Sequence, residues 1–255
     1  MKINVLVLRA AGTNCDAETV YAWQQVGAEA EALHVSRLLE CPSRLDDVDI
    51  LTLAGGFSYG DDIAAGKILA NQLVHHLGDV LRRFVERGRL VLGICNGFQV
   101  LAKTGLLDDE GVDKPSATVT FNGSARYEDR WVHLRVETDH CAFLSAGQIL
   151  YLPVAHAEGK VVTRDRVALA QLDQRDRIAL RYVDADGNPG DYPVNPNGSE
   201  DNIAGLTDAT GRVLGLMPHP ERNIHLTHHP LWTRLAKDRE PDGVKVFRSA
   251  MRYLM

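Results

Sequence analysis

The segment that most restricts how this chain can fold places a strand, a sharp turn and a helix in immediate succession. The apolar run at residues 90–92 leads directly into Gly93-Ile94-Cys95-Asn96-Gly97. Small residues flank the cysteine because so tight a turn leaves little room for side chains. The pattern predicts a nucleophile elbow, with Cys95 at the N-terminus of a helix whose dipole favours the thiolate. On this pentad alone, a strand-to-helix turn with an inert buried cysteine is an equal alternative.

Strands and helices are expected to alternate in the first part of the chain. Strands are predicted at residues 1–10 and 49–53, in addition to the one that precedes the elbow. One helix is predicted after the first strand, in a segment that carries Val20, Trp23 and Val26 on one face, and a second at residues 71–87. This alternation implies right-handed crossovers and a parallel sheet with helices on both faces.

The later part of the chain has a different pattern. Four short strand-like runs without long helices between them lie at 117–121, 131–137, 149–154 and 178–183, and a last helix is expected at 243–254. Antiparallel hairpins are therefore predicted there. We expect an α/β fold of three layers, a mostly parallel sheet flanked by helices, with antiparallel strands in the second half. Residues 1–255 are expected to form a single domain.

Composition and charge restrict the possible partners. Of the 255 residues, 45% are hydrophobic and 24% are charged, which is enough apolar material for a full core. The formal net charge of −6 is spread along the chain, so neither nucleic acid nor a membrane is expected as a partner. No apolar run approaches the roughly 18 residues that a membrane helix needs.

The cysteines indicate a reducing environment. Cys15, Cys41, Cys95 and Cys141 lie far apart and form no Cys-x-x-Cys pair. No metal-ligand spacing surrounds them, so a metal site is not expected. Free thiols of this kind fit a cytoplasmic location.

A candidate base and its orienting acid follow the apolar run 213–217, in the segment Pro218-His219-Pro220-Glu221. The two prolines exclude a helix around the histidine, so an extended backbone is expected. Residues two apart in an extended chain share a face, and the Glu221 carboxylate would then fix the tautomer of His219. Together with Cys95 they would form a Cys-His-acid triad. Taken without the elbow, His-x-Glu is more often a polar strand end.

A thioester-forming cysteine also needs donors for an oxyanion. Gly55-Gly56-Phe57 follows the strand at 49–53, and glycine lets backbone approach a substrate closely. We expect the oxyanion hole to be formed by N–H groups of Gly56 or Phe57 and of Asn96, at the carboxyl edge of the sheet. By itself, Gly55-Gly56 is better explained as an ordinary tight turn.

Five segments together resemble the class I glutamine amidotransferases, whose fold is flavodoxin-like. These segments are residues 12–16, 55–61, 93–99, 195–199 and 217–222, spread over nearly the whole chain. The resemblance implies that Cys95, His219 and Glu221 are the catalytic triad and that Gly55 and Gln99 hold the substrate glutamine. Less specifically, it places Phe121, Asn122, Ser124 and His156 in loops that face the substrate or a partner.

The same segments are similar to glutaminase subunits that supply ammonia to an ATP-dependent synthetase of purine biosynthesis. That similarity implies a synthetase subunit and a small accessory subunit as partners, with ATP and Mg²⁺ on the synthetase and no cofactor on this chain. The residues agree, since Gly60-x5-Gly66-Lys67-Ile68 lacks the spacing and the hydroxyl of a P-loop. Another class I amidotransferase, a cysteine amidohydrolase on the same fold and a non-catalytic regulatory subunit remain alternatives.

Overall fold

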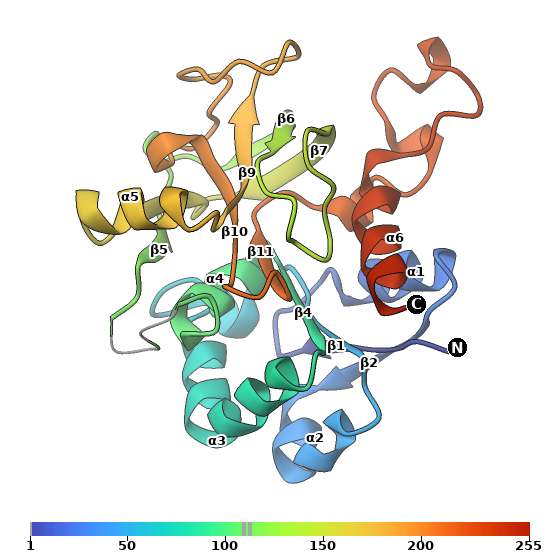
Figure 1. Ribbon diagram of the computed structural model, residues 1–255, viewed down its shortest axis with the longest axis vertical. Coiled ribbons are helices and arrows are strands. Elements are labelled where there is room, and N and C mark those ends of the chain that lie inside the picture. The colour runs from blue at the N-terminus through green and yellow to red at the C-terminus, as the bar shows by residue number, and fades with distance from the viewer. Residues whose placement is uncertain (1, 109–110, 112–113) are drawn as a thin grey trace.

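The computed structural model describes residues 2–108, 111 and 114–255 (Figure 1). Within them the main sheet runs in the order β2-β1-β3-β4-β11-β10-β9-β6-β7. Its first five strands are parallel to one another: β1 Asn4–Arg9, β2 Glu29–His34, β3 Ile50–Leu53, β4 Leu90–Ile94 and β11 Val213–Leu216. The other four are antiparallel: β6 Glu128–Val136, β7 Ile149–His156, β9 Ile178–Val183 and β10 Ile203–Thr207. The expected α/β fold, with antiparallel strands in the second half, is confirmed.

Helices cover both faces of the parallel part, as Figure 1 shows. On one face, α1 Asp16–Gln25 packs against α6 Asp242–Leu254, where Trp23 meets Phe247 edge to face at 4.8 Å. On the other face lie α3 Lys67–Glu86 and α4 Asn96–Thr104. Both faces must be covered because every residue of β3 and β4 is buried.

Two glycines let α4 lie unusually close to the sheet. A Cβ on Gly93 of β4 would come within 2.5 Å of Leu101, and one on Gly215 of β11 within 2.2 Å of Phe98. Real Cβ atoms do not approach other atoms so closely, so any larger residue would push α4 away. The glycines therefore fix the position of the helix that begins after Cys95.

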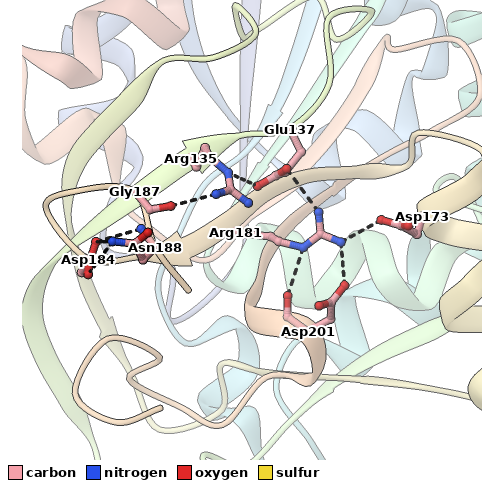
Figure 2. Close-up of polar contacts among 8 residues, drawn as sticks. All are labelled: Arg135, Glu137, Asp173, Arg181, Asp184, Gly187, Asn188 and Asp201. Atoms are coloured by element: carbon pink, nitrogen blue, oxygen red, sulfur yellow. Dashed lines mark hydrogen bonds and ion pairs between the residues drawn. The ribbon is translucent and has the colours of Figure 1, made fainter. Parts of the chain in front are cut away.

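The antiparallel part contains a cluster of paired charges around Arg181 of β9 (Figure 2). The guanidinium, whose side chain is 14% exposed, pairs with Glu137 at 3.3 Å, Asp173 at 2.8 Å and Asp201 at 2.6 Å. Arg135 of β6 also pairs with Glu137 and donates to the Gly187 carbonyl at 2.8 Å. One arginine thus ties β9 to β6, to α5 Arg166–Gln174 and to the turn before β10.

Several elements were not predicted from apolar spacing. They are the edge strand β2, strand β10, the short helices α2 Val35–Glu40 and α5, and β8 Lys160–Thr163, which pairs with the predicted strand β5 Ala117–Thr120 in a separate two-stranded sheet. Strand β2 is hard to recognise because none of its residues is fully buried.

In the part of the chain that the structure describes, no helix is both long enough and apolar enough to cross a membrane.

Candidate active site

Cys95 lies at the predicted elbow, between β4 and α4, in a strained conformation with φ 51° and ψ −103°. Its N–H donates to the Leu216 carbonyl of β11 at 2.8 Å, which joins the elbow to the neighbouring strand. A Cβ on Gly97 would lie 2.0 Å from the Leu53 carbonyl oxygen, so only glycine fits in the first turn of α4. The side chain of Cys95 is buried, with the residue 5% exposed.

His219 and Glu221 form a buried pair, with the Nδ1 of the imidazole 2.6 Å from a carboxylate oxygen. The histidine is 2% exposed and the glutamate 1% exposed. The expectation of an extended backbone through both residues is wrong, because Pro220 begins a 3₁₀ turn, Pro220–Arg222. Proline is favoured at the first position of a helical turn, since its missing N–H is not needed there. The carboxylate reaches the ring from the turn nonetheless.

Burial and neighbouring charges act in opposite directions on the imidazole of His219. Burial is the largest single effect and lowers the pKa, but the charge of Glu221 and the contributions of Cys95 and Cys15 together outweigh it. The result is a pKa well above the ordinary value of 6.5. Nε2 of the ring is buried and has no hydrogen-bond partner among the described residues.

One pocket brings Cys95 and His219 together. The described residues that line it are Asn14, Cys15, Gly56, Phe57, Asp61, Cys95, Gln99, Tyr127, Ala155, His156, Ala157, Glu158, His219 and Arg222. Roomier hollows beside α3 and beside β2 have no cysteine or histidine among their described lining residues. Of these three, the pocket at the carboxyl ends of β3, β4 and β7 is the one whose described lining includes a cysteine and a histidine.

The predicted oxyanion donors differ in availability. The N–H of Phe57 donates to the Gly12 carbonyl at 3.0 Å and is engaged within the protein. Gly56 has φ +138°, and a Cβ there would lie 2.7 Å from the Asn14 nitrogen, so the strand end requires glycine. This leaves the N–H groups of Gly56 and Asn96 as the better candidates.

The other predicted substrate residues are divided between the pocket and its surroundings. Gln99 lines the pocket, and its amide is held by the Asn96 side chain at 2.9 Å and by the Glu158 carbonyl. Gly55 makes room for the imidazole, since a Cβ there would lie 2.9 Å from Cε1 of His219. Phe121 and Ser124 are exposed and are not among the described lining residues, whereas Asn122 is buried behind the pocket wall.

His156, which the resemblance placed facing the substrate or a partner, lines the pocket, whereas sequence reasoning assigned no role to Cys15 and Arg222 in the same wall. Cys15 is almost fully buried, its Sγ accepts from Arg222 at 3.2 Å, and burial raises the pKa of its thiol. Ligand atoms of Cys15, His219 and Glu221 lie within 4.8 Å of one another, as in a metal site. A guanidinium bonded to the sulfur disfavours a cation there. The residues next to Cys15 and Arg222 in the sequence gave no sign of the contact between these two side chains.

Comparison with known proteins agrees with this geometry. The family described as the CobB/CobQ-like glutamine amidotransferase domain matches residues 2–254. The chain therefore belongs to the glutamine amidotransferases of this family.

Individual relatives point to one branch of the family. The chain is 44% identical to the "Phosphoribosylformylglycinamidine synthase subunit PurQ" of Dehalococcoides mccartyi, over 99% of this chain and 98% of that protein. It is 38% identical to the subunit of the same name from Methanococcus maripaludis, over 98% and 96% of the two chains. A chain of the PurLQS structure from Thermotoga maritima superposes with a TM-score of 0.75 and 32% identity, with both chains fully covered.

Proposed function

We propose that residues 1–255 form one glutaminase domain, in which Cys95, His219 and Glu221 hydrolyse the side-chain amide of glutamine. The observation that carries the proposal is the buried His219–Glu221 pair, which shares a pocket with a cysteine at a strained elbow. Membership of the glutamine amidotransferase family supports the same chemistry.

The reaction proceeds through a thioester. The Cys95 thiolate attacks the amide carbon, an S–C bond forms, and the N–H groups of Gly56 and Asn96 stabilise the oxyanion. The C–N bond then breaks as the imidazolium of His219 gives its proton to the nitrogen, which leaves as ammonia. The neutral imidazole next takes a proton from water, and the hydroxide cleaves the thioester to glutamate and the free thiolate.

The ammonia is proposed to serve an ATP-dependent synthetase. The two relatives above are named as subunits of phosphoribosylformylglycinamidine synthase, and the Thermotoga maritima structure is of PurLQS. By this similarity the chain is the glutaminase subunit of that enzyme, in which formylglycinamide ribonucleotide becomes formylglycinamidine ribonucleotide in purine biosynthesis. Its partners are a PurL-like synthetase, which holds ATP and Mg²⁺, and a small PurS-like subunit, in the cytoplasm.

The test uses the complex reconstituted with these two partners and compares two nitrogen sources. In a complex with the Cys95→Ala chain, glutamine-dependent synthesis should fall at least about 10³-fold, while ammonium should still support synthesis. Cys41→Ala is the matched control, because Cys41 is an exposed cysteine outside the pocket. Glutamine turnover that survives in the Cys95→Ala complex would refute the assignment.

Two alternatives predict different results. A general cysteine amidohydrolase would cleave amides other than glutamine without any partner. A regulatory subunit would leave Cys95 unlabelled by an electrophile shaped like glutamine, and glutamine would not support synthesis even with the wild-type chain.

A further inference from the structure

A second histidine lines the pocket, and the reaction above does not use it. His156 is the last residue of β7 and is 2% exposed. Its Nε2 is buried and has no hydrogen-bond partner among the described residues. Buried polar atoms are nearly always bonded, so an unbonded one in the wall of a pocket indicates a place for a ligand group.

The tautomer of His156 is fixed by Asn122. The Asn122 amide nitrogen donates to the carbonyls of Arg126 at 2.8 Å and of His156 itself at 2.9 Å. The amide oxygen therefore faces Nδ1 of the His156 ring at 3.1 Å, and it also accepts the N–H of Gly159 at 2.9 Å. An amide oxygen can only accept, so Nδ1 carries the proton and Nε2 presents a lone pair.

The ring is also held neutral and in one orientation. Burial, together with the neighbouring His219, lowers the pKa of His156 to about 3. A Cβ on Gly159 would lie 2.3 Å from the ring, so the imidazole packs flat against the backbone of that glycine. Nε2 is thus an acceptor at neutral pH and too weak a base to take a proton from water.

We infer that His156 is a substrate-binding residue whose Nε2 accepts an N–H of the glutamine carboxamide. The inference rests on the proposed function and adds a basis for its specificity. A carboxamide offers one acceptor oxygen, for the oxyanion donors, and two N–H groups, one of which meets Nε2. A glutamate carboxylate offers only acceptors, so one of its oxygens would face the lone pair. The contact therefore selects amide over acid and holds the nitrogen beside His219.

The test compares two substrates that differ in the leaving group. L-glutamine has N–H donors, whereas L-glutamate γ-methyl ester has none. In the reconstituted complex, His156→Phe should lower kcat/KM for glutamine roughly 10- to 100-fold, the usual effect of losing a buried hydrogen bond. Hydrolysis of the ester should change less than about 3-fold. His76→Phe is the matched control, since His76 lies exposed on α3.

Two further measurements keep the outcomes distinct. His156→Gln places an amide oxygen near the position of Nε2 and should restore part of the glutamine activity. In a Cys95→Ala background, which removes turnover, His156→Phe should reduce the preference of the chain for binding glutamine over glutamate by a similar factor.

Each result has one meaning. A parallel loss of amide and ester hydrolysis, with no change in the binding preference, would show that His156 is only structural and would overturn the inference. Unchanged glutamine kinetics in His156→Phe would overturn it as well. A wild-type complex that does not hydrolyse glutamine would instead refute the proposed function, and the binding preference would still decide the role of His156.

Discussion

The parallel and antiparallel parts of the sheet are stabilised in different ways. In the parallel part, β3 and β4 are buried along their whole length, and glycines let α4 lie directly on the sheet. In the antiparallel part, Arg181 joins separate elements through ion pairs with three acids. The parallel part carries the elbow, whereas the antiparallel part supplies the pocket wall through Ala155 and His156. We therefore expect that one added methyl group in the parallel part disturbs the geometry of the active site. Loss of the Arg181 charge in the antiparallel part should leave that geometry unchanged.

The largest effect is expected for Glu221→Gln, which removes the acid that orients His219. Glutamine hydrolysis should fall about 10²- to 10⁴-fold, because the imidazole loses both its tautomer and its charge partner. The measurement is kcat of the reconstituted complex, with ammonium-dependent synthesis as the control. A loss below about 10-fold would show that the pair does not orient the base.

The same variant should change the pH dependence of stability. His219 has a folded-state pKa raised above 6.5, so its protonation stabilises the folded chain fully below pH 6.5. That contribution is lost as the pH rises through the raised pKa. The difference in unfolding free energy between wild type and Glu221→Gln should be greater at acidic than at alkaline pH, as urea titrations would show. An opposite trend would contradict the charge assignment.

The next effect tests how tightly the parallel part is packed. Gly97→Ala places a methyl group 2.0 Å from a backbone oxygen of Leu53, which cannot move without breaking β3. We expect a loss of more than about 3 kcal/mol in unfolding free energy. Gly78→Ala in α3 is the control, since no atom lies closer than 4.0 Å to its Cβ, and it should stabilise the helix by up to about 1 kcal/mol. Equal stability of the two variants would refute the packing argument.

A smaller effect is expected in the antiparallel part. Arg181→Leu should cost about 1 to 3 kcal/mol, because the guanidinium is largely buried while two of its acids are half exposed. Glutamine turnover per folded molecule should stay within about 2-fold of wild type, since Arg181 does not line the pocket. A large fall in turnover without loss of stability would remove the distinction between the two parts.

The smallest effect provides the baseline. Arg82 pairs with Asp79 on the exposed side of α3, and both side chains are mostly solvated. Arg82→Ala should therefore change the unfolding free energy by no more than about 0.5 kcal/mol. A cost comparable with that of Arg181→Leu would mean that exposure does not decide the strength of these pairs.

Sequence reasoning predicted the parallel part better than the rest, for a physical reason. Strands buried on both faces are continuous apolar runs, and the elbow needs small residues at fixed positions, so β1, β3, β4 and Cys95 were recognisable. The edge strand β2 alternates weakly and has no fully buried residue, so it gave no such signal.

The pocket wall was less predictable than the elbow. Cys15 and Arg222 are far apart in sequence, and their contact exists only after α1 packs beside the turn that follows β11. The role proposed for His156 depends on its bond to Asn122, whose side-chain oxygen also accepts the N–H of Gly159, and no periodicity reveals these bonds. Proline chemistry predicted an extended chain around His219, and this was wrong because a proline can also begin a 3₁₀ turn.

Cys95 has a positive φ, so the residue that the proposed chemistry requires at this position is less favourable for folding than glycine would be. A residue with a Cβ at this φ costs about 1 to 3 kcal/mol that glycine would not. Cys95→Gly should therefore give a chain that is inert but more resistant to denaturation than wild type, whereas Cys95→Ala keeps the strain. Variants selected only for folding would drift toward glycine at the elbow, so a screen for thermostability must also assay turnover.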